Sequence, residues 1–68
     1  MLTVLKDLKP GDLVHDEYHS LKHDVNTYML LISLKKSEHY LHCMETIFLT
    51  KYGLKKEIQY WQVKFLKI

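Results

Sequence analysis

The chain has 68 residues, with ten lysines, no arginine, eight acidic residues and a formal net charge of +2. This length fits one domain, residues 1–68, without a second core. Its apolar content of 47% is ordinary for a folded domain and excludes an intrinsically disordered chain. Its one cysteine, Cys43, excludes an intramolecular disulfide and a cysteine-based structural zinc site. A domain this small buries only about 60% of the surface of its unfolded chain, so a partner protein would add stability.

Hydrophobic patterning predicts a cytoplasmic protein with no membrane partner. The longest apolar run, residues 28–32, is far shorter than the roughly 20 residues that a spanning helix needs. The N-terminal residues lack the cationic and long apolar regions of a signal peptide. Lys, Ile and Tyr are used in place of Arg and Ala, which indicates an AT-rich genome and favours a bacterial or phage-encoded small protein. For a phage protein, the compartment would be the host cytoplasm.

The first half of the chain predicts a turn, a strand, a loop and a second strand. Residues 9–12, Lys-Pro-Gly-Asp, have the composition of a type II turn, because proline presets φ and Gly11 supplies a positive φ. A strand is expected near residues 12–18, followed by a polar loop. Residues 27–35 alternate so that Tyr28, Leu30, Ile32 and Leu34 share one face, while Met29, Leu31 and Ser33 share the other.

The second half predicts three further strands. Residues 39–51 fit a helical spacing as well as a strand. The strand is favoured because residues 46–50, Thr-Ile-Phe-Leu-Thr, prefer strands, no N-cap precedes the segment and the neighbouring segments are extended. A strand near 54–60 follows the turn at Tyr52-Gly53. The alternation then slips by one residue, which predicts a bulge or 3₁₀ turn at residues 60–62 before a last strand near 63–67. We therefore expect Trp61 to pack into the core and Tyr60 to be partly exposed.

The order of these elements resembles that of the SH3-like small β-barrels. Residues 8–14, Leu-Lys-Pro-Gly-Asp-Leu-Val, resemble the opening of that family, and Gly53, Trp61 and the final Phe-Leu-Lys-Ile are similar to its closing strands. The resemblance implies an all-β fold, a five-stranded barrel with strands near 12–18, 27–35, 39–51, 54–60 and 63–67. It implies no catalytic activity and no cofactor, because barrels of this shape serve many binding functions.

Aromatic and lysine side chains are the candidate binding residues. Tyrosine is favoured in protein interfaces, and the chain carries more aromatic residues than a small core needs. The expected function is a non-catalytic interaction module that binds a protein partner, or forms a homo-oligomer, through an aromatic and apolar face. The alternative is weak, sequence-tolerant nucleic-acid binding, without the arginines that read base edges. The candidate residues are Tyr28, Tyr40, Tyr52, Tyr60, Lys55 and Lys56.

Metal binding and catalysis have only weak candidates. His15, Glu17 and His19 would share one face of a continuing strand and could approach a metal ion, but solvated residues at the end of a strand explain them better. Cys43 lies near His39 and His42, yet no orienting third group is evident. We therefore expect no catalytic residues, no metal and no enzyme activity.

Overall fold

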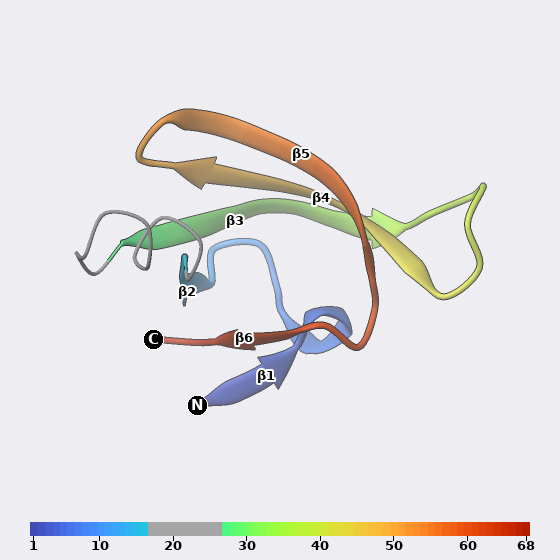
Figure 1. The fold of residues 1–68 in the computed structure, drawn as a ribbon, viewed down its shortest axis with the longest axis horizontal. Helices are drawn as coiled ribbons and strands as arrows, with labels where there is room; N and C mark the ends of the chain where they lie inside the picture. Colours follow the sequence, from blue (N-terminus) through green and yellow to red (C-terminus); the bar gives the residue numbers. More distant parts are fainter. Residues whose placement is uncertain (17–26) are drawn as a thin grey trace.

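Two antiparallel sheets make up the part of the chain that the structure describes, which confirms the all-β class (Figure 1). The computed structural model describes residues 1–16 and 27–68. Six strands and one 3₁₀ helix form in the described part: β1 (Leu2–Val4), η1 (Leu5–Asp7), β2 (Leu13–His15), β3 (Tyr28–Lys36), β4 (Cys43–Thr50), β5 (Gly53–Tyr60) and β6 (Lys64–Leu66).

The two sheets do not close into a barrel, which corrects the expected five-stranded barrel. One sheet has the strand order β2-β3-β4-β5, and the other pairs β1 with β6. A single antiparallel bridge between Val14 and Lys67 links them at the β2 side. The N-terminal strand β1, which the sequence pattern did not predict, pairs antiparallel with β6. No strand of the described part joins β5 to β6, so the fold stays open there.

Strand boundaries differ most from the prediction at residues 39–51. The strand is real and the helical alternative is wrong, but β4 begins only at Cys43. The Ser37 hydroxyl accepts hydrogen bonds from the backbone N–H groups of His39 and Tyr40, at 3.2 and 3.1 Å, and thereby holds a loop. His42 has a φ of 62°, which ends the loop and keeps residues 39–42 out of the strand.

The strand predicted at residues 12–18 is also shorter in the described part. β2 ends at His15, and residues 17 and 18 lie outside the described residues. The last strand is confined to Lys64–Leu66. A turn precedes it, in which Val63 N–H donates to the Tyr60 carbonyl at 3.1 Å. This turn lies where the slip in alternation predicted one.

The predicted turn at residues 9–12 is confirmed. Asp12 N–H donates to the Lys9 carbonyl at 3.0 Å, and Lys9 N–H donates back to the Asp12 carboxylate at 2.8 Å. Gly11 has a φ of 97°, which L-residues with a side chain rarely adopt.

Replacing Gly11 with alanine is expected to destabilise the protein by about 1–2 kcal/mol, because the backbone conformation opposes an L side chain. An added Cβ would meet no atom within 4 Å, so the cost is conformational and not steric. Chemical denaturation measures it. Chemical synthesis with D-alanine at position 11 is the control and should preserve stability; an equal loss for both enantiomers would contradict this explanation.

A β-bulge in β3 changes which residues enter the core. The register with β4 shifts between Leu31 and Ser33, so two residues of β3 lie across from Ile47. Leu34 therefore moves to the inner face, opposite Thr46, and packs against the core. The expected alternation, which grouped Leu34 with Tyr28, is wrong beyond the bulge.

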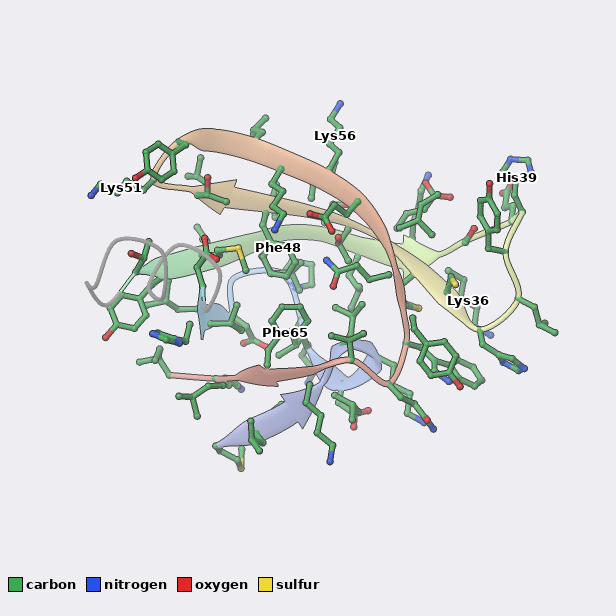
Figure 2. The ribbon with its side chains drawn as sticks, viewed as in Figure 1. Lys36, His39, Phe48, Lys51, Lys56 and Phe65 are labelled. Atoms are coloured by element: carbon green, nitrogen blue, oxygen red, sulfur yellow. The ribbon has the colours of Figure 1, made fainter. Side chains whose placement is uncertain are left out.

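The core lies between the inner face of the four-stranded sheet and the strands β1 and β6 (Figure 1). Phe48 from β4 and Phe65 from β6 meet at its centre with ring centroids 5.5 Å apart (Figure 2). The buried apolar residues are Leu5, Leu8, Val14, Met29, Leu31, Met44 and Phe48, with Leu34, Trp61 and Phe65 packed against them.

Candidate protein interface

A row of four leucines crosses the outer face of the four-stranded sheet. The register places Leu13 opposite Leu30, Leu30 opposite Leu49, and Leu49 opposite Leu54. Residues that lie directly opposite one another in an antiparallel ladder project from the same side of the sheet. Leu49 is 45% exposed and Leu54 63% exposed, although leucine normally stabilises a fold by burial. The row therefore presents apolar surface to solvent from all four strands.

A second group of residues extends this face towards the other end of the sheet. Exposed Ile32 lies in the bulge, across from Ile47, and exposed Ile58 lies opposite Glu45 on β5. A shallow depression of about 600 Å³ lies between Ile47, Ile58 and the neighbouring charged side chains. We call the face formed by these residues the outer sheet face; its apolar members are Leu13, Leu30, Ile32, Ile47, Leu49, Leu54 and Ile58.

Charged residues border the outer sheet face and do not interrupt the leucine row. Lys35 lies opposite Glu45, and their side chains form an ion pair at 3.7 Å. Lys56 lies opposite Ile47 on the same face and points away from the core (Figure 2). An apolar centre with a polar border is the usual organisation of a protein interface.

The structure separates the six residues predicted to bind a partner. Tyr28 and Tyr52 lie at one end of the strands, at the start of β3 and in the β4–β5 turn. Tyr60 lies at the other end of the outer sheet face, opposite Cys43, and Tyr40 lies in the loop beside that end. Lys56 faces the outer side of β5 and Lys55 the inner side, so the six side chains do not form one patch.

Lysines and aromatic rings lie in several separate groups in the described part of the chain, one of which, Lys36 with Tyr40 and Trp61, lines a hollow beside the loop at residues 37–42. Lys51 lies over the Tyr52 ring at 5.9 Å, and Lys6 lies over the Trp61 ring at 5.4 Å, at the other end of the sheet. Lys55 points to the inner side and pairs with Glu57 at 3.0 Å. Nucleic-acid binding therefore stays an alternative prediction.

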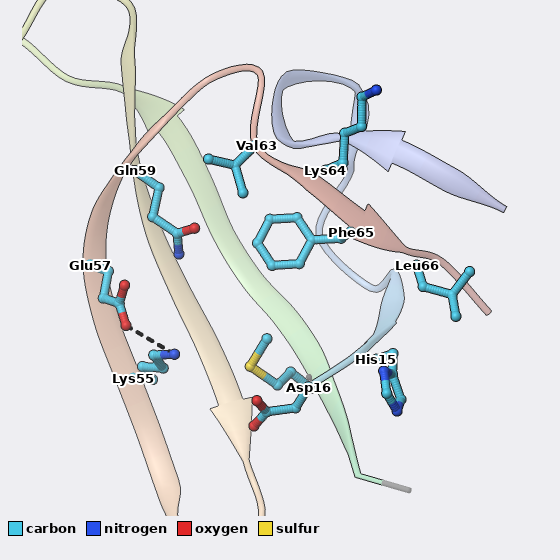
Figure 3. Close-up of a pocket in the computed structure, with 10 residues that line it drawn as sticks. His15, Asp16, Lys55, Glu57, Gln59, Val63, Lys64, Phe65 and Leu66 are labelled. Carbon is cyan, nitrogen blue, oxygen red and sulfur yellow. Dashed lines mark ion pairs between the residues drawn. The ribbon is translucent and has the colours of Figure 1, made fainter. Parts of the chain in front are cut away.

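A second hollow, of about 200 Å³, lies on the inner side where β5 and β6 fail to meet (Figure 3). The Lys55–Glu57 ion pair and Gln59 line its β5 wall, and Phe65 lines its β6 wall. The polar inner face of β5 explains why the apolar core does not extend to this edge.

A third hollow, of about 550 Å³, lies beside the loop at residues 37–42. Trp61 forms part of its wall, and the His42 ring lies against the indole with centroids 4.5 Å apart. Trp61 is half-buried against the core, while Tyr60 is 47% exposed. These positions follow the expectation for Tyr60, whereas Trp61 is less deeply buried than expected.

The weak metal candidates form no group in the described part of the chain, whereas Cys43, His39 and His42 line the same hollow beside the loop at residues 37–42. Glu17 and His19 lie outside the described residues, and the His15 ring lies edge-on to Tyr28 at 5.8 Å. Within residues 1–16 and 27–68, no group of three His, Cys, Asp or Glu side chains could hold a metal ion. Cys43 is half-buried on β4.

No family model, curated protein or solved structure matches this chain. None of the described residues forms a helix that is long and apolar enough to cross a membrane. The class of protein therefore rests on geometry: a small all-β chain with an exposed apolar sheet face.

The leucines of the outer sheet face were missed as site residues because apolar residues in strands are normally assigned to the core. One signal was present in the sequence. In residues 28–34 and 46–49, apolar side chains occur at both odd-numbered and even-numbered positions, so each strand has two apolar faces. A two-layer protein of this size can bury only one of them. Which face is left exposed depends on where β1 and β6 pack.

Proposed function

We propose that the protein is a non-catalytic interaction module whose outer sheet face binds another protein. The leucine row carries this proposal, because three of its four side chains are exposed, and apolar patches on a protein surface mark interaction sites. Tyr28 and Tyr60 at the two ends of the face supply aromatic residues of the kind enriched in interfaces.

The SH3-like resemblance remains part of this proposal. Two features support it: the bridge from Val14 to Lys67 brings the last strand beside β2, and a tight turn separates β5 from β6. An interaction role as a bacterial or phage accessory protein accords with the small size of the chain.

Photo-crosslinking tests the proposed face directly. A photoreactive amino acid placed at Leu49 should yield discrete protein adducts in cells that produce the protein, and adding Ile58→Lys should abolish them. The matched control position is Leu41, which is 84% exposed but lies in the loop at residues 37–42, away from the face. Absence of adducts at Leu49, or equal adducts at both positions, would reject the outer sheet face as the binding surface.

A further inference from the structure

One edge of strand β5 is not paired with any other described strand. This strand is the last in the order β2-β3-β4-β5, and no strand of the described part pairs with its other side. The edge is eight residues long, from Gly53 to Tyr60, whereas the opposite side of the sheet is linked to β6 through the Val14–Lys67 bridge. A long edge strand with free backbone groups is a template for pairing with another strand.

The register identifies the backbone groups that are free. Trp61 N–H donates to the His42 carbonyl at 2.9 Å, so hydrogen-bonded pairs recur at every second position from there along β5. The intervening residues Leu54, Lys56 and Ile58 therefore direct their N–H and C=O groups away from β4. Their side chains project from the outer sheet face, and Leu54 and Ile58 are exposed.

We propose that β5 pairs antiparallel with β5 of a second copy, about a two-fold axis at Lys56. The inference rests on the proposed function, because it names a second copy of this chain as a protein partner. A two-fold axis perpendicular to the sheet keeps the two outer sheet faces on the same side. The two sheets then form one continuous sheet, and the leucine rows of both copies lie on one surface.

Complementary side chains favour this register. It places Leu54 opposite Ile58 of the second copy on the outer side, and Lys55 opposite Glu57 of the second copy on the inner side. By symmetry each contact occurs twice. The backbone N–H and C=O groups of Leu54, Lys56 and Ile58 that point away from β4 all find partners in the second copy. Residues 54, 56 and 58 of one copy pair with residues 58, 56 and 54 of the other.

The neighbouring register, centred on Glu57, is less favourable. It places Glu57 opposite its own copy and Lys55 opposite Gln59, so both complementary ion pairs are lost. The register centred on Lys56 has one opposing contact, between the two Lys56 side chains. Like charges directly opposite in a ladder are destabilising, so this contact supplies a test of the register.

Proline substitution along β5 tests the edge pairing. Lys56→Pro removes only a backbone N–H that points away from β4, so the β4–β5 ladder should remain intact and the variant should fold. Sedimentation velocity over a concentration series should show dimers for the wild type and monomers for Lys56→Pro at every concentration. The matched Lys55→Pro removes a backbone N–H that donates to β4, and the variant should lose the fold, as seen by circular dichroism.

Two further variants separate the outcomes. Lys56→Gln relieves the like-charge contact and should tighten the dimer by up to about five-fold. This variant also tests the register if Lys56→Pro fails to fold, because unchanged or weaker association would overturn the proposed register. Leu49→Lys alters the outer sheet face on β4, away from the edge, and should leave the dimer intact.

A monomeric wild type, or a dimeric Lys56→Pro, would overturn the edge inference. If Leu49→Lys alone becomes monomeric, association occurs through the outer sheet face, so the proposed function stands and the edge pairing falls. If the wild type is monomeric but the Leu49 crosslinks form, the partner is a different protein. If neither association nor crosslinks occur, both proposals fail.

Discussion

Replacing Phe48 with alanine is expected to leave most of the protein unfolded. Phe48 is fully buried at the centre of the core and packs against Phe65. Removing a buried phenylalanine side chain costs about 3–5 kcal/mol, from lost transfer free energy and from the cavity left behind. A core of this size supplies roughly the same amount, about 3–5 kcal/mol. The free energy of unfolding should therefore fall close to zero.

Circular dichroism and the dispersion of amide resonances measure this loss. The matched control is Leu49→Ala at the neighbouring position, which projects from the opposite face of β4 and should lose less than about 1 kcal/mol. A Phe48→Ala variant with a cooperative unfolding transition near that of the wild type would show that the core is organised differently.

Replacing Trp61 with alanine is expected to cost about 3 kcal/mol, at the lower end for this substitution because the ring is only half-buried. The indole packs against the core, against the His42 ring and under the Lys6 ammonium group. Its Nε1–H is buried and has no hydrogen-bond acceptor among the described residues. An unsatisfied buried donor costs about 1–3 kcal/mol, so Trp61 contributes through contact area and not through hydrogen bonding.

Trp61→Phe separates these two contributions. It keeps much of the ring contact and removes the unsatisfied N–H, so its loss should stay under about 1 kcal/mol. Urea denaturation of both variants and of Tyr60→Ala, the adjacent exposed residue, provides the comparison. Trp61→Phe as destabilising as Trp61→Ala would mean that the indole N–H has a partner in solution.

Local features of the fold follow from the sequence alone. The turn at residues 9–12 is specified by a proline and a glycine whose backbone preferences need no distant contact. The slip in alternation at residues 60–62 similarly predicted the turn before β6. The choice of strand over helix for β4 came from the strand preference of residues 46–50 and from the missing N-cap, although the Ser37 hydroxyl and the positive φ of His42 displaced its start.

The side chains of the outer sheet face could be recognised as apolar but not as exposed. In residues 28–34 and 46–49, apolar side chains occur at both odd-numbered and even-numbered positions, so the sequence determined strands with two apolar faces. Only the packing of β1 and β6 decided that Phe48 would be buried and Leu49 exposed. The bulge in β3 then transferred Leu34 to the core, because one extra residue reverses the side on which every later side chain projects.

Composition and turn chemistry thus determined that this chain is all-β and where several of its turns lie. Tertiary structure decided the strand order, the open edge of β5 and the alignment of four leucines on one face. The physical reason is that turn residues act through their own backbone dihedral angles, whereas register and closure depend on pairings between strands distant in sequence. Closure failed at β5 because its inner face carries Lys55, Glu57 and Gln59, which the apolar core does not cover.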